Sequence, residues 1–229
     1  HGFNSLWFKG NFITTFFVSG VPSIIAGIRL FLLLGYFRPA TPPHYWGPHV
    51  WITLAYGLGS LAFPYSIMLF GHQTAAAFAF IAFFLLFRMS RKGWSFGWAL
   101  LAGGLLGYTL ITDFLAFTVV LVLAIYAVVV VVRQKQMTSK HKLLALLPFI
   151  IGILLPLPLQ LWYNWACFGN ILTSAYRYEV LSEFTEGMRT GLMGITYPKL
   201  EALYQLTFGP RCGLFYGAPF LLFAIPGAY

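Results

Sequence analysis

Long apolar runs, separated by short polar or charged clusters, make up most of the chain. A helix that spans a bilayer needs about 20 mostly apolar residues, so each charged cluster marks the end of one run. These runs predict crossings over residues 12–34, 50–70, 74–87, 94–112, 114–132 and 143–165, and a further one that begins at Gly213. We therefore predict an all-α fold, a polytopic transmembrane helix bundle with about seven crossings.

One apolar stretch is too long for a single crossing. Between residues 39 and 87 the sequence has no Lys, Arg, Asp or Glu, so the chain must fold back within this stretch. Gly71-His72-Gln73 is the polar cluster at which we place the bend. Farther along, Pro148, Pro156 and Pro158 should kink the crossing over residues 143–165 or confine it to packed surroundings.

The composition excludes a water-soluble fold. Hydrophobic residues make up 59% of the 229 positions, and charged residues only 8%. A soluble globular domain carries roughly 25% charged residues, so this chain lacks the polar groups needed to cover its surface.

The distribution of charge predicts which side of the membrane each loop occupies. The net charge of +9 would suggest nucleic acid as the partner of a soluble protein, but in a membrane protein basic residues collect in cytoplasmic loops. The loops with Arg38, with residues 88–92 and with residues 133–142 contain basic residues and no acidic ones. We therefore expect these loops to be cytoplasmic, with no nucleic-acid partner. Every acidic residue then falls on the extracytoplasmic side.

The chain is expected to form a single transmembrane domain over residues 1–229, as a piece of a longer protein. Residues 167–212 form the extracytoplasmic loop of this domain. Within the loop, glutamates recur at helical spacing over residues 174–188, and apolar residues do so over residues 197–207. These patterns predict short amphipathic helices along the membrane surface, or alternatively a solvated lid without chemistry.

Residues that could act on a substrate gather on the predicted extracytoplasmic side. The substrate-binding candidates are His72, Asp113, Asn164, Tyr176, Arg177, Glu179 and Arg211. Carboxylates can accept protons, and the planar fork of arginine suits phosphate. Asp113 could also simply cap the helix that begins at Phe114, and His72 could be a turn residue among lipid headgroups. No metal-ligand spacing or phosphate-binding glycine loop occurs, so we predict no metal site and no cofactor, and leave a divalent-metal requirement open.

Several short motifs occur in an order that resembles a known family. They are residues 54–65 (LAYGLGSLAFPY), Gly71-His72, residues 102–107 (AGGLLG) with Thr112-Asp113, Tyr163-Asn164 with residues 168–170 (FGN) and Tyr176, and residues 209–215 (GPRCGLF) with 218–222 (APFLL). In this order they resemble bacterial membrane proteins of the GT-C glycosyltransferase superfamily, relatives of protein O-mannosyltransferases and aminoarabinose transferases.

The resemblance implies an activity and its partners. It implies transfer of a sugar from a polyprenyl-phosphate donor to an acceptor at the extracytoplasmic face of the bacterial inner membrane, with the donor and membrane lipid as partners. Family members carry a catalytic Asp or Glu in the first outer loop. No residue here matches it, so we expect that residue upstream of His1.

Two other functions stay open. A chain of this type could be a catalytically silent accessory subunit of a larger respiratory or photosynthetic membrane complex. A transporter is disfavoured, because no crossing carries a charge pair at mid-membrane and no inverted repeat is evident.

Overall fold

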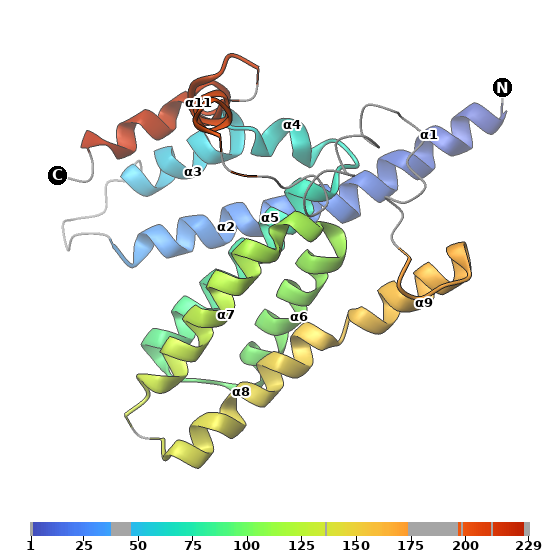
Figure 1. Cartoon of the computed structure of the whole chain (residues 1–229). Coiled ribbons are helices and arrows are strands. Elements are labelled where there is room, and N and C mark those ends of the chain that lie inside the picture. Colours follow the sequence, from blue (N-terminus) through green and yellow to red (C-terminus); the bar gives the residue numbers. More distant parts are fainter. Residues whose placement is uncertain are drawn as a thin grey trace. The chain divides into compact units, whose positions relative to one another are not determined.

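The computed structural model describes residues 2–37, 47–135, 137–173, 197, 199–211 and 213–226 (Figure 1). All regular elements within these ranges are helices, which confirms the all-α prediction. The chain divides into two compact units, His1–Leu157 and Pro158–Tyr229, and each is described by itself below.

The first unit opens with one long helical run. Helix α1 (Gly2–Thr15) continues through a π-helical turn, η1 (Phe16–Gly20), into α2 (Val21–Gly35). The wider turn comes just before Pro22, which has no backbone N–H to donate, and the N–H of Val21 bonds the carbonyl of Phe16 instead.

Two shorter helices return the chain alongside α2. Helix α3 (Pro48–Gly59) and helix α4 (Ala62–Ser66) are separated at Ser60, whose backbone is extended (φ −128°, ψ 177°). Pro64 adds to the break, because it cannot donate a hydrogen bond to a preceding carbonyl. The predicted crossing over residues 50–70 is therefore not one continuous helix.

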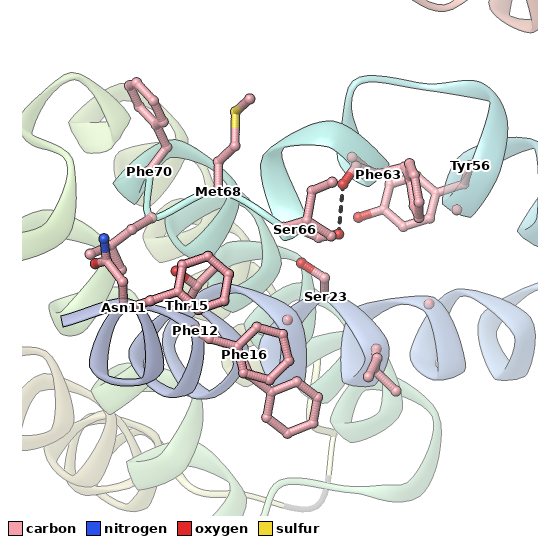
Figure 2. A pocket seen from close by; sticks show the side chains of 18 of the residues that line it. Asn11, Phe12, Thr15, Phe16, Ser23, Tyr56, Phe63, Ser66, Met68 and Phe70 are labelled. Atoms are coloured by element: carbon pink, nitrogen blue, oxygen red, sulfur yellow. Dashed lines mark hydrogen bonds between the residues drawn. The ribbon is translucent and has the colours of Figure 1, made fainter. Parts of the chain in front are cut away.

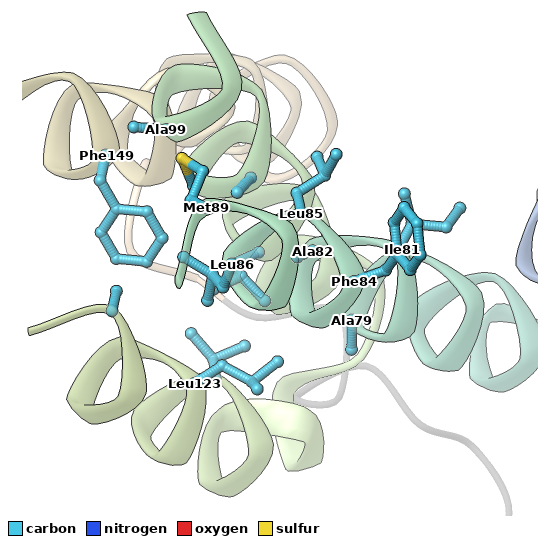
Figure 3. Packing of buried hydrophobic residues seen from close by; sticks show 14 of the residues in the cluster. Ala79, Ile81, Ala82, Phe84, Leu85, Leu86, Met89, Ala99, Leu123 and Phe149 are labelled. Atoms are coloured by element: carbon cyan, nitrogen blue, oxygen red, sulfur yellow. The ribbon is translucent and has the colours of Figure 1, made fainter. Parts of the chain in front are cut away.

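The remaining helices of this unit pack as a bundle (Figure 1). They are α5 (Gly71–Lys92), α6 (Phe96–Thr112), the 3₁₀ turn η2 (Phe114–Ala116) with α7 (Phe117–Val132), and α8 (Ser139–Leu154). Helix α5 is the most buried of the long helices. Its residues Leu85, Leu86 and Met89 are almost fully buried and belong to one core cluster with Leu123 of α7 and Phe149 of α8 (Figure 3).

Glycines let α6 and α8 approach closely. A Cβ atom at Gly103 would overlap the carbonyl oxygen of Phe149, and one at Gly107 would overlap that of Ile153. From the other side, a Cβ at Gly152 would overlap a carbonyl of α6. Spacing of small residues by four positions is a common basis for helix contact in membranes.

The contacts fix the direction of each helix in the bundle. Ser19 lies beside Thr74 and the Arg29 guanidinium lies over the Phe84 ring, so α2 and α5 run in the same direction. At the far end of α5 and α7 lie the basic clusters of residues 88–92 and 133–142. The near end carries His72 and Asp113. The first unit thus separates a basic end from an end with His72 and Asp113, as the charge pattern predicts.

Fewer helices are long enough to cross a membrane than the sequence suggested. Among the described residues, four apolar helical runs have sufficient length: Ser5–Gly35, Gly71–Lys92, Phe114–Val132 and Ser139–Phe168. Helix α6 is a shorter apolar helix. The prediction of about seven crossings is not confirmed, since the structure breaks one of them into α3 and α4. In the described part after Gly213 the helices are short: α12 (Leu214–Gly217) and the 3₁₀ helix η4 (Pro219–Ala224).

Helix α9 (Leu157–Phe168) follows α8 after a break at Leu155 and Pro156, and all of it after Leu157 belongs to the second unit. The break includes Pro156, one of the prolines from which the sequence predicts a kink. Helix α11 (Leu200–Phe208) occupies the second segment predicted to be an amphipathic helix, and its apolar residues Leu200 and Leu203 are exposed. The first such segment, residues 174–188, lies outside the described residues.

Candidate functional site

The start of α5 lies directly against the end of α6. Phe70 is extended and α5 begins at Gly71, where a Cβ atom would lie 3.1 Å from both the carbonyl oxygen and the methyl carbon of Thr112. A side chain at Gly71 would crowd this contact. Because Gly71 has no side chain, the residues that follow Gly71 and Thr112 in the sequence, His72 and Asp113, can come into contact.

His72 and Asp113 form a hydrogen-bonded pair. The Nδ1–H of His72 donates to Oδ2 of Asp113 at 2.7 Å, because an ionised carboxylate can only accept. The other carboxylate oxygen, Oδ1, accepts from the backbone N–H of Leu115 at 3.0 Å and so caps η2. The predicted cap is confirmed, and the same carboxylate also holds the imidazole. The His72 side chain is 63% exposed and that of Asp113 15%, so the pair presents the imidazole outward.

A second set of hydrogen bonds attaches the start of α5 to the first helical run. The hydroxyl of Thr74 donates to the carbonyl of Val18 at 2.9 Å, and the Gln73 amide donates to the Ser23 hydroxyl at 3.1 Å. Thr74 and Gln73 are buried. These polar contacts hold the end of α5 that carries His72 at one position along the α1–α2 helix.

A large groove of about 920 Å³ lies next to this pair, between the first helical run and the α3–α4 segment (Figure 2). Aromatic and aliphatic side chains make up most of its lining, with a few polar groups such as Asn11, Thr15 and Tyr56. Phe70 lines the groove, and its ring stacks near that of His72, with centroids 6.3 Å apart and an interplanar angle of 22°. The groove therefore adjoins the His72–Asp113 pair through Phe70.

Sequence reasoning missed the groove. Glycines at positions 20, 27 and 57 line it and leave space between α2 and α3. Gly20, at the end of η1, and Gly27 of α2 lie seven residues apart on the first helical run, and that spacing was the available signal.

Two of the other predicted site residues, Asn164 and Arg211, belong to the second unit. Asn164 is buried in α9 of the second unit, where it accepts a hydrogen bond from Gln160 and donates one to the carbonyl of Ile171. It therefore closes the turn after α9. Arg211 is exposed in the turn between α11 and α12. Tyr176, Arg177 and Glu179 lie outside the described residues.

The described residues contain no group of three or more His, Cys, Asp or Glu side chains that could hold a metal ion. Comparison of the chain with protein-family models, with curated proteins and with solved structures gives no match.

Proposed function

We propose that the chain is part of a GT-C-type membrane glycosyltransferase, which passes a sugar from a polyprenyl-phosphate donor to an acceptor at the extracytoplasmic face of a bacterial inner membrane. The observation that carries this proposal is the His72–Asp113 pair beside a large apolar groove. Such a site suits a substrate with a charged phosphate at one end and a long hydrocarbon chain at the other.

The groove accounts for the hydrocarbon part of the donor. Inside a bilayer, transfer of a prenyl chain from lipid to an apolar groove brings no hydrophobic gain, since lipid tails are equally apolar. The groove therefore serves to align the chain, and its aromatic lining supplies packing contacts. Selection of the donor then falls to the polar group at its end.

We infer that His72 contacts the donor phosphate. With Nδ1 bound to Asp113, the ring presents Nε2, which donates to a phosphate oxygen when the imidazole is protonated. During transfer the bond between the anomeric carbon and the phosphate oxygen breaks, and a bond to the acceptor oxygen forms. The departing phosphate gains negative charge, which an adjacent imidazolium stabilises. In the family that the chain resembles, proton removal from the acceptor is the role of a catalytic Asp or Glu in the first outer loop.

The proposal also sets the orientation in the membrane. The basic clusters of residues 88–92 and 133–142 face the cytoplasm under the positive-inside rule, so His72 and Asp113 face outward. In this arrangement α3 and α4 together lead the chain from the end of α2 back across the membrane to the start of α5. They then count as one of about seven crossings.

Binding of undecaprenyl phosphate to the purified full-length protein tests the role of His72. This probe contains the phosphate and the prenyl chain but no sugar, so the result does not depend on which sugar the donor carries. We expect His72→Ala to weaken binding roughly tenfold or more, because a hydrogen bond to a charged group contributes about 1.5–3 kcal/mol. His72→Gln, which keeps a donor, should lose less.

His141→Ala is the matched control, since this exposed histidine lies on α8 at the basic end of the bundle. It should bind the probe like the unmodified protein. Equal affinity in the His72→Ala and His141→Ala variants would remove His72 from the site.

A further inference from the structure

A second, smaller pocket lies toward the basic end of the first unit. It has a volume of about 370 Å³ and is formed by α2 and α5. Its lining residues are Arg29, Leu32, Gly35, Tyr36, Phe84 and Arg88. Two of these six residues are arginines, although the surrounding helices are apolar. The pocket shares none of its residues with the large groove beside His72.

The guanidinium group of each arginine lies over an aromatic ring. The Cζ atom of Arg29 lies 5.3 Å from the ring centroid of Phe84, and that of Arg88 lies 4.8 Å from the ring centroid of Trp98. Such cation–π contacts restrict the long side chains without neutralising their charge. The arginines are therefore positioned in advance, with their hydrogen-bond donors still able to bind a ligand.

The first unit offers these arginines no negative partner. Asp113 is the only acidic residue in positions 1–178, and it is bound to His72 at the opposite end of the bundle. In addition, Nε of Arg29 is buried and has no hydrogen-bond partner within the described part of the chain. A buried, unpaired donor on a charged group is unfavourable, and an anion bound to this guanidinium would lower that cost.

We propose that this pocket binds the phosphate of an anionic phospholipid headgroup from the leaflet at the basic end. Guanidinium groups bind phosphate oxygens in pairs, and two of them border the same pocket. Arg29 lies about 9 Å along α2 from the end of that helix at Gly35, which is the depth of headgroups and glycerol rather than of the bilayer centre.

The charges around the pocket select among lipids. Arg91 and Lys92 follow Arg88 in the last turn of α5, so the local field is strongly positive. A zwitterionic headgroup would bring an ammonium group into this field and be repelled, whereas an anionic headgroup lowers the electrostatic cost. Basic pockets between membrane helices commonly bind anionic lipids for this reason.

Native mass spectrometry of the detergent-purified full-length protein tests the site. The protein is titrated with dioleoyl phosphatidylglycerol and, separately, with dioleoyl phosphatidylcholine. We expect the unmodified protein to retain phosphatidylglycerol preferentially. The Arg29→Gln/Arg88→Gln double variant should bind it about tenfold more weakly, a loss that corresponds to about 1.4 kcal/mol.

The control is Arg133→Gln/Lys140→Gln, which removes the same charge from exposed positions at the same end. It should bind phosphatidylglycerol like the unmodified protein, and an equal loss in both double variants would overturn the proposal. Inorganic phosphate is added as a competitor in a second series. Efficient displacement by free phosphate would contradict a lipid occupant.

If the double glutamine variant does not fold, Arg88→Lys provides the same test. Lysine keeps the charge but lacks the planar fork, so we expect a smaller loss of phosphatidylglycerol affinity, about threefold. Unchanged affinity in a folded Arg88→Lys protein would argue against the site.

Discussion

Asp113 stabilises two elements at once, because its two carboxylate oxygens have different partners. One oxygen accepts the backbone N–H of Leu115 and caps the turn that leads into α7. The other accepts Nδ1–H of His72, which lies 41 positions earlier in the chain, at the start of α5. One side chain therefore links the beginnings of α5 and α7, and fixes the orientation of the exposed imidazole.

Substitution of Asp113 can separate its two roles. Asp113→Asn keeps an oxygen that can cap η2, whereas Asp113→Ala removes both contacts. We expect Asp113→Ala to lower the free energy of unfolding by about 1 kcal/mol, the usual contribution of an N-cap, and Asp113→Asn to lower it by less. Thermal unfolding in detergent measures the difference. An alanine variant as stable as the unmodified protein would show that the cap contributes nothing.

At this scale the sequence predicted part of the site. The charge pattern placed His72 and Asp113 on the same side, and the acidic residue before Phe114 indicated a cap, which the structure confirms. Their direct contact depends on the close approach of Gly71 to Thr112. That approach arises from how α5 and α6 pack, and no pattern in the local sequence predicts it. Tyr176, Arg177 and Glu179 stay predictions, since they lie outside the described residues.

Among the helices, α6 and α8 show how small residues determine packing. Gly103 and Gly107 face the backbone of α8, while the neighbouring Gly104 would place a Cβ atom at an ordinary contact distance, 3.9 Å from the carbonyl oxygen of Gly152. All three residues are glycines of the same helix, but they differ in how close they lie to the backbone of α8. The contact between α6 and α8 therefore depends on two of them.

Alanine substitutions test this difference. Gly103→Ala and Gly107→Ala should each lower the free energy of unfolding by about 1–3 kcal/mol, because the added methyl group forces two backbones apart. Gly104→Ala is the matched control and should be neutral or slightly stabilising, since alanine favours helix over glycine. Thermal unfolding of the three variants gives the comparison. Equal effects at all three positions would contradict the close packing of α6 on α8.

The α3–α4 segment shows why the predicted crossing over residues 50–70 is not one continuous helix. An apolar run counts hydrophobic residues, and residues 50–70 satisfy that criterion. Helix α3 nevertheless ends at Gly59, because the backbone of Ser60 is extended and Pro64 has no N–H to donate to a preceding carbonyl. These helix-breaking residues were visible in the sequence, but hydropathy alone gives them too little weight.

On the scale of the whole molecule, the first unit has two chemically different ends. One carries the His72–Asp113 pair beside the large apolar groove, and the other carries the basic clusters beside the pocket with Arg29 and Arg88. Three apolar helical runs that lie wholly in this unit, Ser5–Gly35, Gly71–Lys92 and Phe114–Val132, are long enough to span a membrane between such ends. The charge pattern predicted this separation because positive residues cluster at alternate helix ends, a feature that does not depend on the exact number of crossings.

The orientation of these two ends is the central claim, and cysteine labelling of intact spheroplasts tests it most directly. In a protein whose native cysteines, Cys167 and Cys212, are replaced by serine, single cysteines are introduced at the exposed positions Phe114, Ser90 and Lys140. We predict that a membrane-impermeant maleimide labels the cysteine at 114 from outside, and labels those at 90 and 140 only after the membrane is permeabilised. Labelling of 90 and 140 from outside, with 114 protected, would place the His72–Asp113 pair in the cytoplasm and contradict the account.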